Sequence, residues 1–203
     1  MVGDDKNPGL YFTAVDEIYK IIKKKPSVDY DVSVSVIEIY NEQIRDLLCK
    51  DQSHNSFKLL EGSDGRLYGE QIKRKVSSKN HILKALRDAC FNRTVGVTQF
   101  NEFSSRSHFI LTVFITGYDR ITKQIIKGKL SLVDLAGSER ILKTNAEGIR
   151  VKEAQNINQS LATLGKVILS LQAKQNHIPY RDSKLTHYLK DSIGGNSKTV
   201  IVV

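Results

Sequence analysis

The chain has 203 residues, of which 40% are hydrophobic and 26% are charged, a size and composition that favour one globular domain with a sizeable core. No stretch approaches the roughly 18 consecutive apolar residues of a membrane span. The first residues are acidic and polar, which argues against a signal peptide. We therefore expect a soluble, intracellular, single-domain protein.

The formal net charge of +9 is unevenly distributed along the chain. Residues 1–60 carry 8 basic and 10 acidic side chains, residues 61–139 carry 13 and 8, and residues 140–203 carry 10 and 4. A basic surface usually meets a polyanionic partner, such as nucleic acid, an anionic membrane or an acidic protein surface. Charge alone does not choose among these partners.

The first third of the chain predicts a helix followed by a strand. In residues 10–25, apolar side chains recur at helical spacing, and three lysines and Pro26 follow them, as is typical of a helix end. Residues 32–40 begin with valines that alternate with polar residues, which is the period of a half-buried strand. We expect a short helix next, over residues 44–48.

The middle of the chain predicts a helix and a strand pair. Ser77 or Ser78 is suited to cap a helix that runs to Cys90. Residues 109–118 and 123–133 are rich in aromatic and β-branched residues, and the connection between them is short enough for a hairpin.

The last third predicts two helices and a terminal strand. One apolar stripe marks a long helix, and it consists of Ile157, Leu161, Leu164, Ile168 and Leu171. A loop with Pro179 and a shorter helix through Leu185 and Leu189 follow, and residues 199–203 read as a strand. Interspersed helices and strands of this kind indicate a layered α/β domain with at least one antiparallel strand pair.

The most specific local pattern is L-S-L-V-D-L-A-G-S-E-R over residues 130–140. An apolar strand ends in Asp134, whose carboxylate is suited to hold the water shell of Mg²⁺. Gly137 follows, and a glycine lets its backbone N–H approach a terminal phosphate without a Cβ in the way. An aspartate that merely caps a turn remains the alternative for this pattern alone.

A second polar pattern, N-E-F-S-S-R-S-H over residues 101–108, stands between a predicted helix and a buried strand. Serine hydroxyls are suited to bind Mg²⁺ or phosphate, and Arg106 could pair with a carboxylate such as Glu139. Serines that satisfy turn and cap positions are the alternative, which their density disfavours.

These two patterns, in this order and separation, resemble the switches of kinesin motors. Three further stretches resemble the same family: E-I-Y-N-E-Q-I-R-D-L-L over residues 38–48, N-I-N-Q-S-L over 156–161, and I-P-Y-R-D-S-K-L-T over 178–186. The resemblance covers essentially the entire chain. It implies a layered fold similar to the P-loop NTPases, with a central mixed sheet and helices on both faces.

The resemblance also implies roles for the switch residues. Asn101, Ser104, Ser105 and Arg106 match switch I, in which Ser105 approaches Mg²⁺ and the γ-phosphate of ATP. Asp134, Gly137 and Glu139 match switch II, in which Asp134 holds Mg²⁺ through water and Gly137 donates to the γ-phosphate. A salt bridge between Arg106 and Glu139 would close the site and position the attacking water. ATP and Mg²⁺ are thus the cofactors expected of the complete motor.

The family's track-facing segments match the basic part of this chain, where residues 140–190 contain nine Lys or Arg and three Asp or Glu. The candidate microtubule-binding residues are Lys143, Arg150, Lys152, Lys174, His177, Arg181 and Lys184. Tubulin has an acidic surface, so attraction by charge is physically reasonable. We expect the protein in the cytoplasm on the microtubule cytoskeleton, with no nucleic-acid or membrane partner. A dimer formed through segments outside this chain is a further hypothesis.

The family's phosphate-binding loop, G-x-x-x-x-G-K followed by Ser or Thr, does not occur in the sequence. We therefore interpret residues 1–203 as part of a kinesin motor domain, truncated at both ends and lacking the first strands and the P-loop. We do not expect this chain to hydrolyse ATP alone. A non-catalytic microtubule-binding module is the second hypothesis, and a basic nucleic-acid binder ranks well below both.

Overall fold

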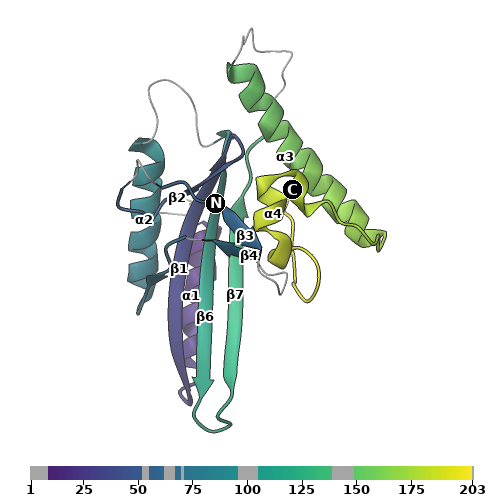
Figure 1. Ribbon diagram of the computed structural model, residues 1–203. Coiled ribbons are helices and arrows are strands. Elements are labelled where there is room, and N and C mark those ends of the chain that lie inside the picture. Colours follow the sequence, from purple (N-terminus) through teal and green to yellow (C-terminus); the bar gives the residue numbers. More distant parts are fainter. Residues whose placement is uncertain are drawn as a thin grey trace.

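A five-stranded antiparallel sheet lies at the centre of the computed structural model, which describes residues 9–51, 55–61, 67–69, 71–95, 105–138 and 149–202 (Figure 1). The strands follow the order β2-β1-β6-β7, and β5 pairs with β1. Their bounds are β1 Val28–Tyr40, β2 Gln43–Asp46, β5 Arg74–Lys75, β6 His108–Asp119 and β7 Ile125–Asp134. A separate antiparallel pair is formed by β3 (Leu59–Glu61) and β4 (Leu67–Gly69).

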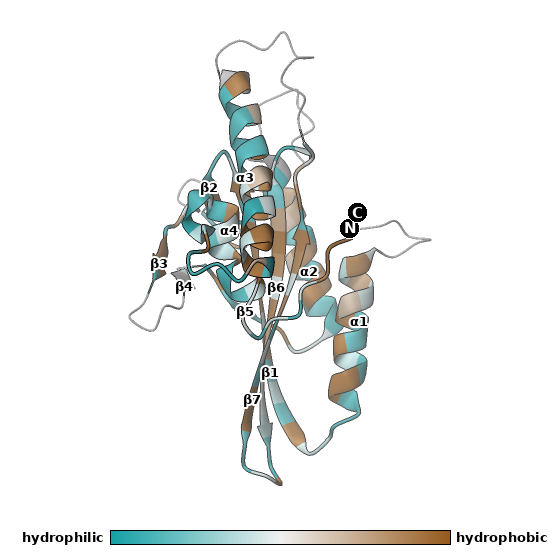
Figure 2. Cartoon of the chain, turned by 90° about the vertical axis from the view of Figure 1, so that its right-hand side faces the viewer, coloured by the Kyte–Doolittle hydropathy of each residue, from teal (hydrophilic) through white to brown (hydrophobic). Residues whose placement is uncertain are grey.

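Helices cover both faces of the sheet (Figure 2). One face carries α1 (Leu10–Lys23) and α2 (Lys79–Val95), and the other carries α3 (Ile149–Gln172) and α4 (Lys184–Tyr188). Short 3₁₀ turns flank α4, at Tyr180–Asp182 and Lys190–Ser192. None of the described helices is long and apolar enough to cross a lipid bilayer.

The two faces arise from the alternation of side chains along β1 and β6. Val34 and Leu111 point into a core with α1 and α2, whereas Ile37 and Ile110 point into a core with α3 and α4. All four are fully buried. Because successive side chains of a strand point to opposite faces, a strand buried on both sides must be apolar at consecutive positions, and β6 begins in that way.

Most of the predicted elements are confirmed. The helices expected over 10–25, from Ser78 to Cys90 and along the long apolar stripe are α1, α2 and α3, and the expected strands are β1, β6 and β7. The hairpin between the last two strands also forms, and its turn is held by the Asp119 carboxylate, which accepts from the backbone N–H of Ile121 at 2.8 Å. The parallel strands of the predicted mixed sheet do not occur among the described residues, in which every pairing is antiparallel.

The short helix expected over residues 44–48 is wrong, because this segment contains β2, which turns back onto β1. Asn41 and Glu42 form the turn with φ of 50° and 59°, and Tyr40 pairs directly with Gln43. Two successive residues with positive φ produce the tight hairpin turn whose twist matches that of the strands. Asparagine tolerates this conformation well, so Asn41 was the signal that the helix interpretation missed.

The strand expected over residues 199–203 is also wrong for the described part of that range. Residues 199–202 have no regular secondary structure, and Val200 and Val202 are 86% and 85% exposed. A β-branched run forms a strand only where a neighbouring strand satisfies its N–H and C=O groups. Among the described strands, none pairs with this segment.

Trimming one methyl group at two positions of the β6–β7 hairpin tests the two-faced core. Ile110→Val is expected to lower the free energy of unfolding by about 1 kcal/mol, because Ile110 is fully buried and the methyl leaves a cavity. Ile126→Val is the matched control, since Ile126 is 51% exposed, and it should change stability by less than about 0.5 kcal/mol. Urea denaturation followed by circular dichroism measures both. Equal effects of the two changes would contradict the assignment of the buried face.

Candidate nucleotide-sensing site

The two polar motifs meet at one end of the sheet, where β6 begins and β7 ends. Phe109 pairs with Asp134 in the ladder between these strands. Just beyond, the backbone N–H of Gly137 donates to the carbonyl oxygen of Ser105 at 2.9 Å. Segments that stand about 30 residues apart in sequence are thus joined directly.

Two oxygen donors that the resemblance assigns to magnesium, Ser105 and Asp134, lie at this end of the sheet. Ser105 and Asp134 are both half-buried, and hydroxyl and carboxylate oxygens are the ligands that Mg²⁺ prefers. Among the described residues, no group of three or more His, Cys, Asp or Glu side chains is placed to hold a metal. A cation here would therefore need oxygens from a phosphate group and from water, which is the usual manner of Mg²⁺ binding beside a nucleotide.

Neither backbone conformation nor packing against the described residues requires a glycine at position 137. Its φ does not belong to the left-handed region, which among the described glycines is adopted by Gly194 and Gly195. A Cβ at Gly137 would meet only the Ser105 carbonyl oxygen, at the ordinary contact distance of 3.8 Å. The residue is exposed, so contacts among the described residues do not account for the missing side chain.

Arg106 forms an ion pair with a residue that the sequence did not suggest. Its Nη1 lies 3.5 Å from Oε2 of Glu153, which stands near the start of α3. The predicted partner, Glu139, lies outside the described residues. Glu153 is buried. Arg106 thus ties the first motif to α3.

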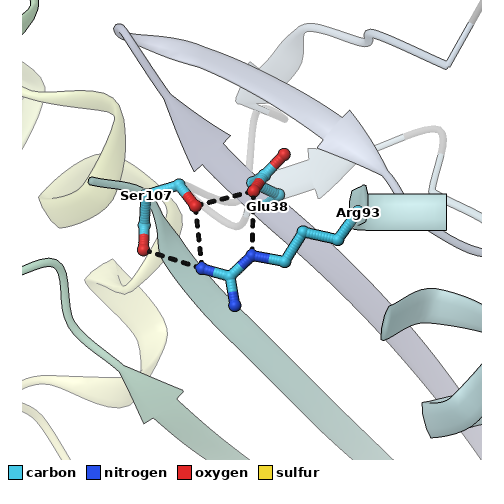
Figure 3. Close-up of polar contacts among 3 residues, drawn as sticks. All are labelled: Glu38, Arg93 and Ser107. Atoms are coloured by element: carbon cyan, nitrogen blue, oxygen red, sulfur yellow. Dashed lines mark hydrogen bonds and ion pairs between the residues drawn. The ribbon is translucent and has the colours of Figure 1, made fainter. Parts of the chain in front are cut away.

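A buried polar triad holds the first motif from behind (Figure 3). Arg93, at the end of α2, donates through Nε to Glu38 of β1 at 3.1 Å and through Nη2 to the hydroxyl of Ser107 at 2.8 Å. Ser107 donates in turn to Glu38 at 2.6 Å. The guanidinium also lies 5.2 Å from the ring centroid of Phe109.

This triad closes the base of the segment that contains the predicted switch I residues. Arg93 stands before that segment and Ser107 after it, so the contacts between them fix both ends. Asn101 and Ser104 belong to the segment and lie outside the described residues. The sequence did not indicate a role for Arg93, and nothing in the local pattern marks it. Glu38 and Ser107, in contrast, belong to the motifs over residues 38–48 and 101–108.

The aromatic side chain of Tyr11 packs behind the second motif. Its ring centroid lies 5.9 Å from that of Phe109, and its hydroxyl is buried without a hydrogen-bond partner in the structure. Burial raises the pKa of Tyr11 well above its ordinary value, and the negative charge of Asp134 raises it further. The Tyr11 hydroxyl therefore stays protonated near the carboxylate of Asp134.

The described candidates for microtubule binding lie along α3 and the segment that follows it. Lys152 is in the first turns of α3, and Lys174 follows its end with a φ of 50°. His177 and Arg181 continue toward Lys184, which begins α4, and all of these side chains are exposed. Lys143 lies outside the described residues, and Arg150 is placed only as part of the helix α3.

Arg181 is held by an acidic residue from a distant hairpin. Glu61 of β3 forms ion pairs with Arg181 and with Lys190, the latter at 2.6 Å. Hydrogen bonds from these two cations lower the pKa of Glu61 to about 2. One of the predicted track-facing cations is thus partly neutralised by an internal contact that local sequence does not predict.

Comparisons with known proteins agree with this geometry. The family model described as the kinesin motor domain matches residues 1–203. The kinesin-like protein KIN-14E of Oryza sativa subsp. japonica is 44% identical over 205 residues, which cover 100% of this chain and 19% of that protein. KIN-14R of Arabidopsis thaliana is 42% identical, again over 100% of this chain and 19% of the relative.

A solved structure agrees in fold as well. The structure of a fast kinesin, whose title refers to its ATPase mechanism and its interactions with microtubules, superimposes with a TM-score of 0.84 at 39% identity. The match covers 97% of this chain and 56% of that one. The chain spans about a fifth of the length of the curated relatives named above. It belongs to the kinesin motor domain family.

Proposed function

We propose that this chain is the switch-bearing and track-facing part of a microtubule-based motor ATPase. The observation that carries the proposal is the 2.9 Å hydrogen bond between Gly137 and Ser105, which joins the two motifs beside the carboxylate of Asp134. Such a contact suits a sensor of γ-phosphate, because a backbone N–H that binds its neighbour in one state is able to bind phosphate in another. Membership of the kinesin family supports the same conclusion.

In the complete motor, Ser105 and Asp134 would hold Mg²⁺, the latter through water, and Asn101 and Ser104 would line the nucleotide. The ion would supply positive charge to the phosphate oxygens. Gly137 would exchange its contact with Ser105 for one with the γ-phosphate. Such a site acts by positioning and electrostatics.

The pair of Arg106 and Glu139 is proposed to close the site. One partner of Arg106, Glu153, stands 3.5 Å away, which is longer than the roughly 2.8 Å of a strong charge-assisted hydrogen bond. A second carboxylate is therefore able to compete for the guanidinium. Exchange of Arg106 between α3 and the loop after β7 would couple closure of the site to the position of the helix.

The outer side of α3 and the segment after it are proposed to face the microtubule. Lys166 and the 65% exposed Leu169 line a shallow hollow of about 440 Å³ on this helix. Exposed cations follow at Lys174, His177, Arg181 and Lys184. A surface that combines positive charge with one apolar contact suits the acidic surface of tubulin, so we place the protein on cytoplasmic microtubules.

Co-sedimentation of this chain with polymerised microtubules tests the proposal. The variant Lys174→Ala/Arg181→Ala/Lys184→Ala is expected to lower affinity at least about tenfold at low salt. The matched control Lys23→Ala/Lys24→Ala/Lys25→Ala removes the same charge at the end of α1 and should bind as the wild type does. Glu61→Gln, which releases Arg181, should bind more tightly by about twofold to fivefold. Absence of wild-type binding, or equal losses in the two triple variants, would refute the proposed surface.

A non-catalytic microtubule-binding module is the second candidate. Sequencing the native transcript upstream of Met1 separates the two. An open reading frame that continues into a phosphate-binding loop supports the motor ATPase, in which this chain is one part of a larger motor domain. A transcript that starts at Met1 supports the binding module.

A further inference from the structure

His108 forms a buried polar connection between the loop after β7 and the middle of α3. The backbone N–H of Ala136 donates to Nδ1 of His108 at 3.0 Å. On the other side of the ring, Nε2 lies 2.8 Å from the hydroxyl oxygen of Ser160. That hydroxyl donates to the carbonyl oxygen of Ile157 at 2.7 Å.

The direction of every bond in this connection is fixed. A backbone N–H only donates, so Nδ1 accepts and the single proton of the neutral ring sits on Nε2. Nε2 therefore donates to Ser160, whose own proton is used by Ile157. His108 and Ser160 are 3% and 2% exposed, so the chain of bonds is buried.

The position of these residues suggests more than a satisfied core histidine. Ala136 directly precedes Gly137, whose N–H donates to the carbonyl oxygen of Ser105. On α3, Glu153, Ile157 and Ser160 follow one another at helical spacing and are all buried. One buried face of α3 thus forms an ion pair with Arg106, through Glu153, and a hydrogen bond with His108, through Ser160. Arg106 stands two residues before His108, which begins β6.

We propose that His108 is a positioning residue that couples the backbone of the loop after β7 to α3 through Ser160. This inference deepens the proposed function, on which its meaning for a motor rests. The ion pair of Arg106 is partly exposed and able to exchange, whereas the His108 connection is buried and directional. It therefore sets where Ala136 and Gly137 stand relative to the helix.

Hydrogen exchange of the Ala136 amide, measured by NMR on the nucleotide-free chain, tests the coupling. Ser160→Ala removes the bond on the helix side only, and it is expected to lower the protection of Ala136 about fivefold to tenfold. Ser170→Ala, on the same helix and 9% exposed, is the matched control and should leave that amide unchanged. The imidazole ¹⁵N shifts of His108 should report the Nε2–H tautomer in the wild type.

The variant His108→Asn completes a double-mutant cycle. Its Oδ1 takes the place of Nδ1 and accepts from Ala136, but its side chain is too short to reach Ser160. Ser160→Ala added to His108→Asn should then have no further effect on Ala136. Unchanged protection in Ser160→Ala alone, which keeps the histidine in place, would overturn the proposal, as would an Nδ1–H tautomer. Because no microtubule or nucleotide is involved, this result stands apart from the co-sedimentation result.

Discussion

Replacing Arg93 by alanine is expected to lower the free energy of unfolding by about 3 to 5 kcal/mol. The change leaves the Glu38 carboxylate, whose side chain is 3% exposed, buried without its cation. It also removes the donor to the hydroxyl of Ser107. Urea denaturation followed by circular dichroism measures the loss.

Two comparisons show whether the unpaired charge causes the loss. Arg87→Ala, an exposed arginine on the same helix, should change stability by less than about 0.5 kcal/mol. Glu38→Gln introduced into the Arg93→Ala protein replaces the stranded carboxylate by a neutral amide and should recover at least about 1 kcal/mol. If the double variant is no more stable than Arg93→Ala, the triad does not act through the buried charge.

The second large effect is a loss of stability in mild acid. Burial lowers the pKa of His108 from 6.5 to about 4. Between these values the unfolded chain binds a proton that the native state does not bind, so stability present above pH 6.5 is lost as the pH falls toward 4. The shift corresponds to about 3 kcal/mol.

Comparison with His108→Asn isolates this contribution from that of other titrating groups. The difference in unfolding free energy between the wild type and the variant is expected to shrink by about 3 kcal/mol from pH 7 to pH 4. The exposed His81→Asn serves as the control for replacing a histidine by an amide. A pH-independent difference between the wild type and His108→Asn would show that the ring is not held in its neutral form.

Periodicity predicted the main helices and strands because their buried faces are long. The apolar stripe of α3 and the β-branched runs of β6 and β7 leave little choice of secondary structure. The prediction of a helix over residues 44–48 was wrong because the local pattern of this short segment was ambiguous. β2 has only four residues, and its register depends on the conformation of Asn41 and Glu42. The prediction of a strand over residues 199–203 was wrong for residues 199–202 for another reason. A strand forms only where a neighbouring strand pairs with it, and none of the described strands pairs with this segment.

The candidate site likewise contains residues that the sequence indicated and partners that it did not. The motifs predicted a contact between the two loops through Arg106 and Glu139, and the contact that the structure describes is the one between Gly137 and Ser105. The partners that hold them were not predictable from one sequence, because Arg93 reaches Glu38 and Arg106 reaches Glu153 only after the sheet and α3 have packed. The predicted pair of Arg106 with Glu139 stays a prediction.

The ladder between β1 and β6 also determines the order in which the chain assembles. The hairpins β1–β2 and β6–β7 join near neighbours, and such hairpins close within about 1 to 10 μs. The central ladder instead joins Val28 to Asp119 and Ile39 to His108, across all of the intervening segments. During synthesis at about 5 to 20 residues per second, β1 therefore waits several seconds for its partner strand. For that interval an apolar strand edge is available to chaperones, and protein production should respond to their supply more than the stability of the finished fold would suggest.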